Sequence, residues 1–328
     1  MAIVIGCSGS TGSSLLKTIL NRHTHIFAGP EAGLFAFPQL FEDWKRYKDL
    51  MLTKQLKTDG WQMRYGMALL QPAFGWEKAD LLTLISESSS FDNFIQGFFQ
   101  QILQKTQKKI WVAKTPANAM GMAAFLEHFP KGKAVQTIRN PYDTIASLVG
   151  RGMNVYQATG YYVYNTAIAS SNKDHKRYYQ LKYEDLVAAP ETTLVQLFNF
   201  LEIPFDAAIL VAQHEKRVEP TAMKGWKHEE TAAIATSSVG RFQEMSKKQQ
   251  ALIQTTFASF SIRKSFQHRL QIKFNTGRQL CEALDYEFLP VNNNQHRLLL
   301  NTYKWKDQIG RIKHGYWKQF FNYMGEII

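Results

Sequence analysis

The chain has 328 residues, of which 45% are hydrophobic, so it can bury one large core or two modest ones. Its ten prolines and twenty glycines are ordinary numbers, which excludes disorder over most of the length. A formal net charge of +12 favours anionic partners, although a solvated basic surface would give the same composition.

The sequence favours a cytoplasmic protein. Its first residues, MAIVIGCSG, carry no charged leader, and their apolar stretch is too short for a secretory signal. Two cysteines cannot form a disulfide framework, which fits a reducing compartment. The longest uncharged segment, residues 152–172, is rich in Asn, Gln, Thr and Ser, so we expect a buried or cleft-lining helix and no membrane span. Zinc-ligand spacing, RNA-recognition aromatics and long basic runs are missing, so we expect no nucleic acid as partner.

Residues 2–21 predict a strand, a loop and a helix. Residues 25–31, HIFAGPE, predict the end of a second strand, which the Gly-Pro pair stops. Residues 35–107 have a mostly helical pattern, with Trp and Phe interspersed and little strand signal. We expect this stretch to form a helical cap or insertion on the substrate side of the molecule.

Beyond residue 107, short β-rich runs alternate with helical ones. The runs KIWVAKTP (109–116), KAVQTIRNP (133–141) and YYQLKYEDL (178–186) each predict a strand that ends in a loop or a helix. This alternation predicts an α/β fold with a parallel central sheet.

The last segment, residues 291–328, has a different composition. It contains six Lys or Arg against two Asp or Glu, and its end is rich in aromatic residues. We expect an amphipathic tail that docks on the body of the protein, with a dimer contact and a membrane-surface helix as the alternatives.

The first loop, within GCSGSTGSSLLKTIL (6–20), is suited to an anion. A strand followed by small residues and then a helix directs backbone N–H groups and a helix N-terminus at one place. The loop does not match a Walker A motif, because Gly12 is followed by Ser13 rather than Lys, so an ATP or GTP loop is disfavoured. A Gly/Ser turn without a ligand is the alternative. The candidate binding residues, with glycines for close approach and hydroxyls as donors, are Gly9, Ser10, Thr11, Gly12, Ser13 and Ser14.

A second candidate element is RNPYDTIAS (139–147), which follows a predicted strand and opens a helix through Pro141. Arg139 can form two parallel bonds to a phosphate, and Ser147 lies about two turns along the helix. On its own, the Arg-Asn-Pro sequence would also fit an ion pair at the end of a strand.

Four segments in this order resemble the PAPS-dependent sulfotransferases. They are GCSGSTGSSLL, the stretch from KTPANAM to RNPYDTIAS, LKYEDLVAAPETTLVQLFNFLEIP and SSVGRFQ. The resemblance covers roughly residues 2–290. It implies a P-loop-NTPase-like, three-layer αβα fold with a central parallel sheet, in which 1–290 is the sulfotransferase domain, 35–107 a helical insertion and 291–328 a basic extension.

The resemblance also implies an activity. These enzymes transfer the sulfuryl group of 3′-phosphoadenosine 5′-phosphosulfate (PAPS) to a hydroxyl or amine of a small molecule, and release adenosine 3′,5′-bisphosphate without a metal. The first loop, 9–14, would hold the phosphosulfate, and Arg139 and Ser147 the 3′-phosphate. A late loop would close over that phosphate through Ser238, Gly240 and Arg241. Tyr183 is a neighbour of the nucleotide or, equally, a packing residue.

The first loop departs from the family pattern at one position. The family's loop carries a cation that contacts the departing phosphate, whereas this chain has Ser10 there. Lys114, in the KTP sequence after a predicted strand, is the leading replacement, because family members carry a similar element near the sulfate. Lys17 is a weaker candidate, and Lys114 could also be a solvated residue at the end of a strand.

A base must accept the proton of the acceptor. Glu31 occupies the place where several members of the family carry a catalytic carboxylate, and His25 and His23 are rivals just upstream. Glu31 would also fit a simple helix N-terminal carboxylate, and each histidine an ordinary surface or core residue. The missing loop cation keeps a catalytically silent bisphosphate-binding protein as the alternative function. The strand, loop and helix at the start keep a nucleotide kinase as a third hypothesis, which the missing Gly-Lys pair disfavours. A homodimer is left open.

Aromatic residues of 35–107 and 153–167 could line a pocket for a flat or apolar acceptor, but core packing is the favoured interpretation. They are Trp44, Trp61, Phe74, Trp76, Tyr156, Tyr161 and Tyr162.

Overall fold

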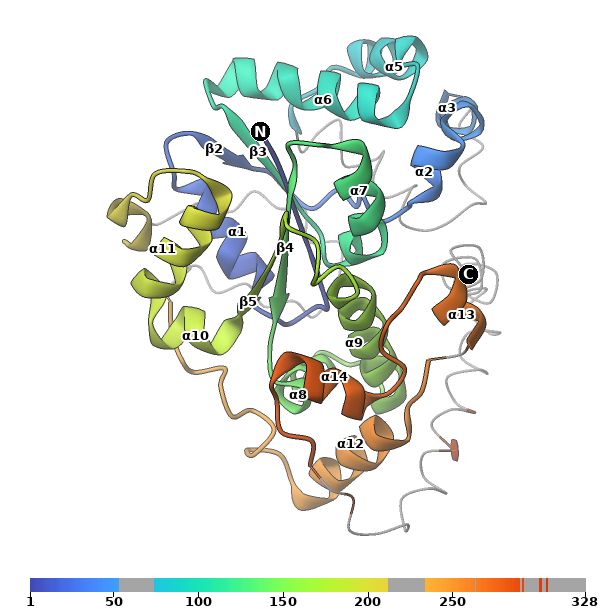
Figure 1. Cartoon of the computed structure of the whole chain (residues 1–328), viewed down its shortest axis with the longest axis vertical. Helices are drawn as coiled ribbons and strands as arrows, with labels where there is room; N and C mark the ends of the chain where they lie inside the picture. Colours follow the sequence, from blue (N-terminus) through green and yellow to red (C-terminus); the bar gives the residue numbers. More distant parts are fainter. Residues whose placement is uncertain are drawn as a thin grey trace.

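A parallel five-stranded sheet forms the centre of the protein, shown by a computed structural model (Figure 1). The structure describes residues 1–52, 74–211, 234–262 and 264–289, together with 291, 301, 302 and 305. The strand order is β2-β3-β1-β4-β5, so the first strand lies in the middle. The strands are β1 (Ala2–Cys7), β2 (Ile26–Ala28), β3 (Ile110–Lys114), β4 (Lys133–Ile138) and β5 (Tyr178–Lys182).

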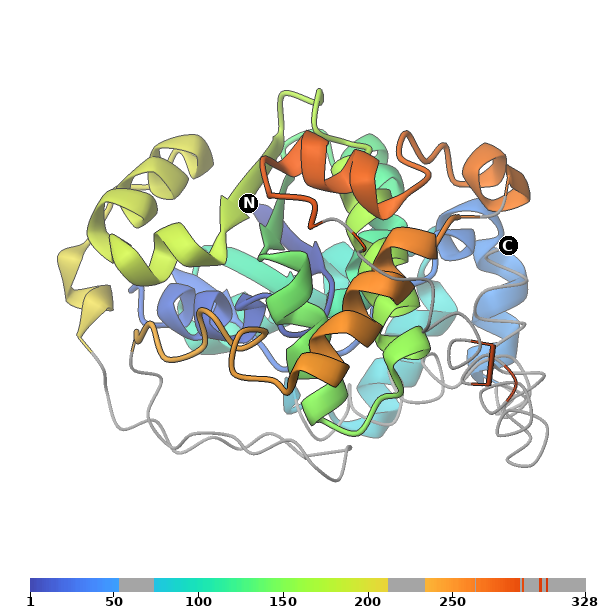
Figure 2. The same ribbon diagram turned by 90° about the horizontal axis from the view of Figure 1, so that it is seen from below.

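Alternate residues of β1 supply two separate cores. Ile3 and Ile5 pack in one apolar cluster, whereas Ala2 and Val4 pack in the other, because successive side chains of a strand point to opposite faces. Helices cover both faces, so the molecule has three layers, α, β and α (Figures 1 and 2). The expected three-layer fold with a parallel sheet is thus confirmed.

One face is covered by the helices whose side chains share the cluster of Ile3 and Ile5. They are α1 (Ser13–Asn21), α10 (Tyr183–Ala188) and α11 (Pro190–Leu201), with the short 3-10 helix η3 (Ala207–Leu210) beside them.

The other face carries the larger cluster. Its helices are α6 (Phe91–Thr106), α7 (Met122–His128) after the 3-10 helix η2 (Pro116–Gly121), α8 (Pro141–Gly150), α9 (Val155–Ser170), α12 (Lys247–Ser259) and α14 (Gly277–Leu284), with α13 (Lys264–Arg269) nearby in the chain.

The segment 35–107 is helical where the structure describes it. It contains α2 (Gln39–Glu42), α3 (Trp44–Leu52), α5 (Lys78–Glu87) and α6. Residues 53–73, including the predicted pocket residue Trp61, and nearly all of 291–328 lie outside the described residues.

The long uncharged segment folds as expected into a mostly buried helix, α9. Within the ranges that the structure describes, no helix is both long and apolar enough to cross a membrane.

Aromatic stacking joins the helical segment to the sheet. Trp111 of β3 stacks on Phe99 of α6, with ring centroids 4.1 Å apart and planes 7° from parallel. Phe35 stacks near the same ring at 6.0 Å and 9°. Aromatic pairs of this kind add to the free energy that burial of the rings already supplies.

Replacing Trp111 with Ala should lower the free energy of unfolding by about 3–5 kcal/mol, because it removes a large buried side chain and leaves a cavity. Urea unfolding followed by circular dichroism measures the change. Val211→Ala, at a side chain that is 64% exposed, is the control and should leave the midpoint almost unchanged. An unaltered midpoint in Trp111→Ala would contradict this account of the core.

Candidate active site

The carboxyl ends of all five strands meet at one edge of the sheet, because the strands are parallel. The first loop follows β1, Glu31 lies in the segment after β2, and Lys114 is the last residue of β3. Arg139 follows β4 directly, and Tyr183 follows β5. In open sheets of this type ligands bind at this edge, so the fold brings most of the predicted residues together.

The first loop turns into α1 through Gly12, whose backbone is left-handed at φ 84°. A Cβ atom at this position would lie 2.4 Å from Cδ2 of Tyr183, so glycine is required both by the backbone and by the ring packed against it. Gly12 is also the N-cap residue of α1 and has no side chain to satisfy the first N–H groups of the helix. These N–H groups suit an anion at the start of α1.

Thr11 faces the sheet. Its Oγ1 donates to the Ser8 carbonyl at 2.8 Å and lies 2.8 Å from Oγ1 of Thr137 in β4. Since a hydroxyl has one proton, Thr11 has no further proton to donate to a ligand. Thr11 therefore fastens the loop to β4, and its backbone, not its hydroxyl, is the part that can contact an anion.

Ser10 also has an uncommon conformation, with φ 67° in a residue other than glycine. Its carbonyl accepts a hydrogen bond of 3.0 Å from Nη1 of Arg139. Its Oγ is buried, and it has no hydrogen-bond partner among the residues described. A buried hydroxyl without a partner is unfavourable unless something else bonds to it.

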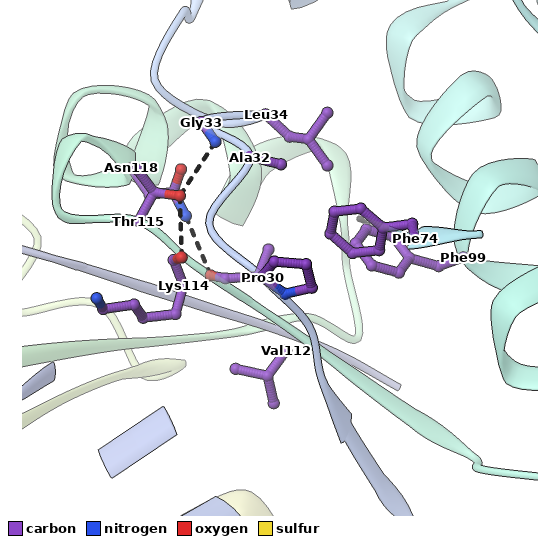
Figure 3. A pocket seen from close by; sticks show the side chains of 11 residues that line it. Pro30, Ala32, Gly33, Leu34, Phe74, Phe99, Val112, Lys114, Thr115 and Asn118 are labelled. Atoms are coloured by element: carbon purple, nitrogen blue, oxygen red, sulfur yellow. Dashed lines mark hydrogen bonds between the residues drawn. The ribbon is translucent and has the colours of Figure 1, made fainter. Parts of the chain in front are cut away.

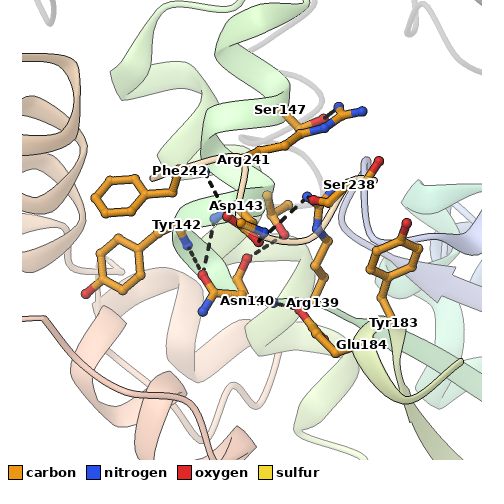
Figure 4. A network of polar contacts seen from close by, with 12 residues as sticks. Arg139, Asn140, Tyr142, Asp143, Ser147, Tyr183, Glu184, Ser238, Arg241 and Phe242 are labelled. Atoms are coloured by element: carbon orange, nitrogen blue, oxygen red, sulfur yellow. Dashed lines mark hydrogen bonds and ion pairs between the residues drawn. The ribbon is translucent and has the colours of Figure 1, made fainter. Parts of the chain in front are cut away.

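Arg139 is 3% exposed and lies at the centre of a polar network (Figure 4). Besides Ser10, its guanidinium donates to the carbonyl of Ser238, and it lies 5.1 Å from the centre of the Tyr183 ring. Asp143 is the nearest carboxylate, at 3.9 Å. Burial, and to a lesser extent the charge of Arg241, lower the pKa of Arg139, whereas Asp143 raises it. Nε of Arg139 is buried and has no partner in the described part of the chain.

Asp143 holds the late loop against α8. Its two carboxylate oxygens accept the backbone N–H groups of Gly240 and Phe242, both at 2.8 Å. The next side chain of this loop, Arg241, donates to Oγ of Ser147 at 3.1 Å. The structure thus brings the predicted 3′-phosphate residues to one place, as Figure 4 shows.

Two carboxylates of this network were not predicted from the sequence. Asp143 stands in the first turn of α8, and Glu184 accepts a bond of 2.8 Å from the N–H of Asn140, which caps the same helix. The only sequence signal for Asp143 was its place in a first helical turn, where a carboxylate is common without any ligand.

A second group of charges surrounds Lys114, whose side chain is 1% exposed. Its Nζ forms an ion pair with the carboxylate of Glu31 and donates to Oγ of Ser14 at 2.8 Å. Because Ser14 belongs to the first turn of α1, this group adjoins the first loop. The predicted cation and the predicted carboxylate are therefore in direct contact.

His25, the third predicted catalytic residue, is not part of this group. Its carbonyl accepts the N–H groups of Lys109 and Ile110, both at 3.0 Å, at the amino ends of β2 and β3. Lys114 ends β3 at the opposite edge of the sheet. His23 is also directed elsewhere, with Nε2 3.1 Å from the carbonyl of Pro204.

The structure is a three-layer α/β protein with charged residues at the carboxyl ends of its parallel strands, and comparison with known proteins identifies its family. A model of the sulfotransferase family matches residues 2–207, more than half of the chain. The chain therefore belongs to the sulfotransferase family.

Two mycobacterial proteins match a shorter part of the chain than the family model does. Omega-hydroxy-beta-dihydromenaquinone-9 sulfotransferase Stf3 of Mycobacterium bovis and of Mycobacterium tuberculosis are each 27% identical over 122 residues. This match covers 32% of the chain and 31% of each mycobacterial protein, about a third of their length.

Two solved structures each align with 88% of the chain. The sulfotransferase domain of the Synechococcus PCC 7002 olefin synthase has 17% identity and a TM-score of 0.48, covering 88% of this chain and 95% of that one. The sulfotransferase domain of the curacin biosynthetic pathway has 20% identity and a TM-score of 0.45, covering 88% and 98%.

Asp143→Ala should release the late loop, because it removes the acceptor of two backbone N–H groups of that loop. If adenosine 3′,5′-bisphosphate binds here, as the sequence resemblance predicts, its affinity should fall about 10-fold or more, the effect of losing hydrogen bonds to a charged group. Calorimetric titration measures the affinity. Asp174→Ala, at a carboxylate paired with Lys273 on the surface, is the control. Equal affinities in the Asp143 variant and the wild type would show that Asp143 does not hold the site.

Proposed function

We propose that the protein is a PAPS-dependent sulfotransferase that acts on a small molecule. The observation that carries this proposal is the presence of two separate cationic groups on either side of β1. Arg139, beside Arg241, lies on the β4 side, and Lys114 lies on the β3 side. The first loop contacts both groups, through the carbonyl of Ser10 and the hydroxyl of Ser14. A nucleotide with a phosphate at one end and a phosphosulfate at the other needs two such groups.

The unpartnered atoms of the site support this fit. Oγ of Ser10 and Nε of Arg139 are buried, and both lack a partner within the described ranges. Nη1 and Nη2 of Arg139 each donate one bond to a neutral carbonyl, and a phosphate would give stronger, charge-assisted bonds. The residues assigned to the nucleotide are Gly9, Ser10, Thr11, Gly12, Ser13 and Ser14 for the phosphosulfate, and Arg139, Ser147, Ser238, Gly240 and Arg241 for the 3′-phosphate. Tyr183, whose ring packs against Gly12 and Arg139, is assigned with them.

In the proposed reaction, Lys114 and Glu31 act on the two oxygens between which sulfur moves. PAPS supplies the sulfuryl group, so the bond from sulfur to the phosphate oxygen breaks while a bond from sulfur to the acceptor oxygen forms. The ammonium of Lys114 stabilises the negative charge that develops on the phosphate. The carboxylate of Glu31 takes the proton of the acceptor.

The ion pair between Lys114 and Glu31 gives these two roles an order. Paired with each other, the lysine is less available to a phosphate and the carboxylate is less available to an acceptor. An anionic phosphosulfate competes with Glu31 for the same ammonium. Binding of the nucleotide would therefore free Glu31, and we propose that PAPS binds before the acceptor.

The organisation of the chain is part of the proposal. Residues 1–290 form the sulfotransferase domain, residues 35–107 its helical insertion, and residues 291–328 a basic extension. A cytoplasmic location remains a prediction from the sequence.

One observation favours a catalytically silent bisphosphate-binding protein as the alternative function. The loop position that carries a cation in the family is Ser10, and the cation that could replace it is already paired with a carboxylate. Incubation with labelled PAPS and a panel of hydroxyl and amine acceptors separates the two functions. Release of bisphosphate supports the transferase, whereas tight bisphosphate binding without turnover for any acceptor supports the alternative.

Lys114→Met should reduce kcat about 100- to 1,000-fold, the effect of removing one group that stabilises a developing charge. The affinity for adenosine 3′,5′-bisphosphate should stay within about threefold, since Arg139 and Arg241 are untouched. Bisphosphate release gives kcat, and calorimetry gives the affinity. Lys247→Met, at an exposed lysine of α12, is the matched control. A wild-type rate in Lys114→Met would remove this residue from the mechanism.

Glu31→Gln should reduce kcat about 100- to 10,000-fold, because the amide cannot accept the proton. The same change removes the competitor for Lys114, so bisphosphate affinity should be equal or higher. A fall in kcat without a fall in bisphosphate affinity is the expected signature, measured as for Lys114. A loss of bisphosphate affinity in Glu31→Gln would contradict the competition between this carboxylate and the nucleotide.

A further inference from the structure

The residues that follow α14, 285–289, contact the two helices that begin next to Arg139, α8 and α10. Asp285 ends α14 with a left-handed backbone, at φ 57°, so the chain turns out of the helix at this residue. The N–H of Tyr286 donates to the carbonyl of Cys281 at 2.9 Å and closes the turn. The turn directs the chain toward α10.

Two contacts attach this segment to the first turns of the two helices. The carboxylate of Asp285 pairs with Lys182 at 3.1 Å, and the ammonium of Lys182 lies 5.1 Å from the centre of the Tyr286 ring. The N–H of Leu289 donates to the hydroxyl of Tyr142 at 2.8 Å. Lys182 is the N-cap residue of α10, and Tyr142 stands in the first turn of α8. The 285–289 segment therefore bridges α10 and α8.

A third contact reaches the residue next to Arg139. Oε2 of Glu184 accepts the hydroxyl of Tyr286 at 2.9 Å, and Oε1 accepts the N–H of Asn140 at 2.8 Å (Figure 4). The side chain of Asn140 in turn accepts two N–H groups of the first turn of α8. A chain of hydrogen bonds thus runs from Tyr286 through Glu184 to the backbone beside Arg139, and each bond orients the next group.

Glu184 acts on Arg139 through its charge, which raises the pKa of the guanidinium. Each oxygen of this carboxylate accepts a bond from another group, while Nη1 and Nη2 of Arg139 donate to the first loop and the late loop. Burial, and then the charge of Glu184, raise the pKa of Tyr286, so its hydroxyl keeps the proton that it donates. Tyr286 therefore fixes the carboxylate, and Arg139 stays directed at the two loops.

The proposed reacting groups on the other side of β1 have separate support. Oγ1 of Thr115 accepts the N–H of Gly33 at 3.0 Å and donates to the carbonyl of Lys114, as Figure 3 shows. These bonds join the end of β3 to the segment that carries Glu31, and no residue of 285–289 takes part in them. A change at Tyr286 should therefore alter nucleotide binding and leave the transfer step intact.

We propose that Tyr286 is a positioning residue for the 3′-phosphate, which acts on Arg139 through Glu184 and Asn140. The proposal deepens the function proposed above and rests on it. Arg139 is the group that contacts the phosphate, and Tyr286 sets the place of its backbone. Residues beyond 207 lie outside the match with the family model, so that match assigns Tyr286 no role.

Tyr286→Phe in the full chain tests this role, because it removes the hydroxyl and keeps the ring. Tyr179→Phe is the matched control, at a half-buried tyrosine whose ring packs against Phe200 in the other core. Calorimetric titration measures the affinities for adenosine 3′,5′-bisphosphate and for adenosine 5′-monophosphate, which lacks the 3′-phosphate. Bisphosphate release from PAPS, with an acceptor from the panel above, gives kcat and KM.

Tyr286→Phe should weaken bisphosphate binding about 10-fold, the effect of losing a hydrogen bond to a charged group. Its affinity for the monophosphate should stay within about twofold, since that ligand has no group at Arg139. The KM for PAPS should rise while kcat is unchanged. Tyr179→Phe should leave all four quantities as in the wild type.

A second pair of variants tests the route through Glu184. Glu184→Ala removes the acceptor of both bonds, so adding Tyr286→Phe to it should change bisphosphate affinity by less than about twofold. A further 10-fold loss in the double variant would overturn the action through Glu184.

Two other results would overturn the positioning role. One is a wild-type bisphosphate affinity in Tyr286→Phe, and the other is an equal loss of affinity for both nucleotides, which a general loosening of the fold would give. Bisphosphate binding that depends on Tyr286, without turnover for any acceptor, would instead overturn the transferase and leave the positioning role standing. Absence of bisphosphate binding in the wild type would overturn the nucleotide site itself, and the role of Tyr286 with it.

Discussion

Two cations, Lys114 and Arg139, are buried at the carboxyl edge of the sheet, and the rest of the site is arranged around them. A buried cation is unfavourable unless charges or hydrogen bonds compensate it. Lys114 has a full partner in Glu31, whereas Arg139 has two carbonyls, an aromatic ring and a carboxylate at 3.9 Å. The positive charge of the neighbouring Arg241 makes the charged form of Arg139 still less favourable, and it lowers the pKa of Arg139 further than burial alone does. An anionic ligand with charge near Arg139 would correct this imbalance.

The sequence predicted the edge of the sheet on which the site lies, because residues after parallel strands meet there. Lys114, Arg139 and Tyr183 each follow or end a β-rich run, and the structure places all three at that edge. The same rule explains why His25 lies elsewhere. A residue that precedes a strand lies at the other edge. The segment HIFAGPE contains both a residue that precedes β2, His25, and a residue that follows it, Glu31.

Contacts between distant parts of the chain could not be predicted in this way. Asp143 binds the backbone of Gly240, 97 residues later, and no local pattern indicates which loop a first-turn carboxylate will hold. The hydroxyl of Thr11 was expected to face the ligand, yet it bonds to Thr137 on the neighbouring strand. Loop hydroxyls have this ambiguity in general, because the same side chain serves a ligand or the scaffold according to the tertiary packing.

Under the proposed function, moving the cation from the first loop to a strand changes how the charge is held. A lysine on a loop must lose its side-chain freedom when the nucleotide binds. Lys114 is the last residue of β3, an interior strand of the sheet. Its side chain is buried and is held by Ser14 and Glu31. Groups that are oriented before the reaction stabilise developing charge without reorganising. The disadvantage is that Glu31 must first release the ammonium of Lys114. The serine at position 10 therefore goes with a fixed cation in place of a mobile one, and this cation becomes available only when the nucleotide binds.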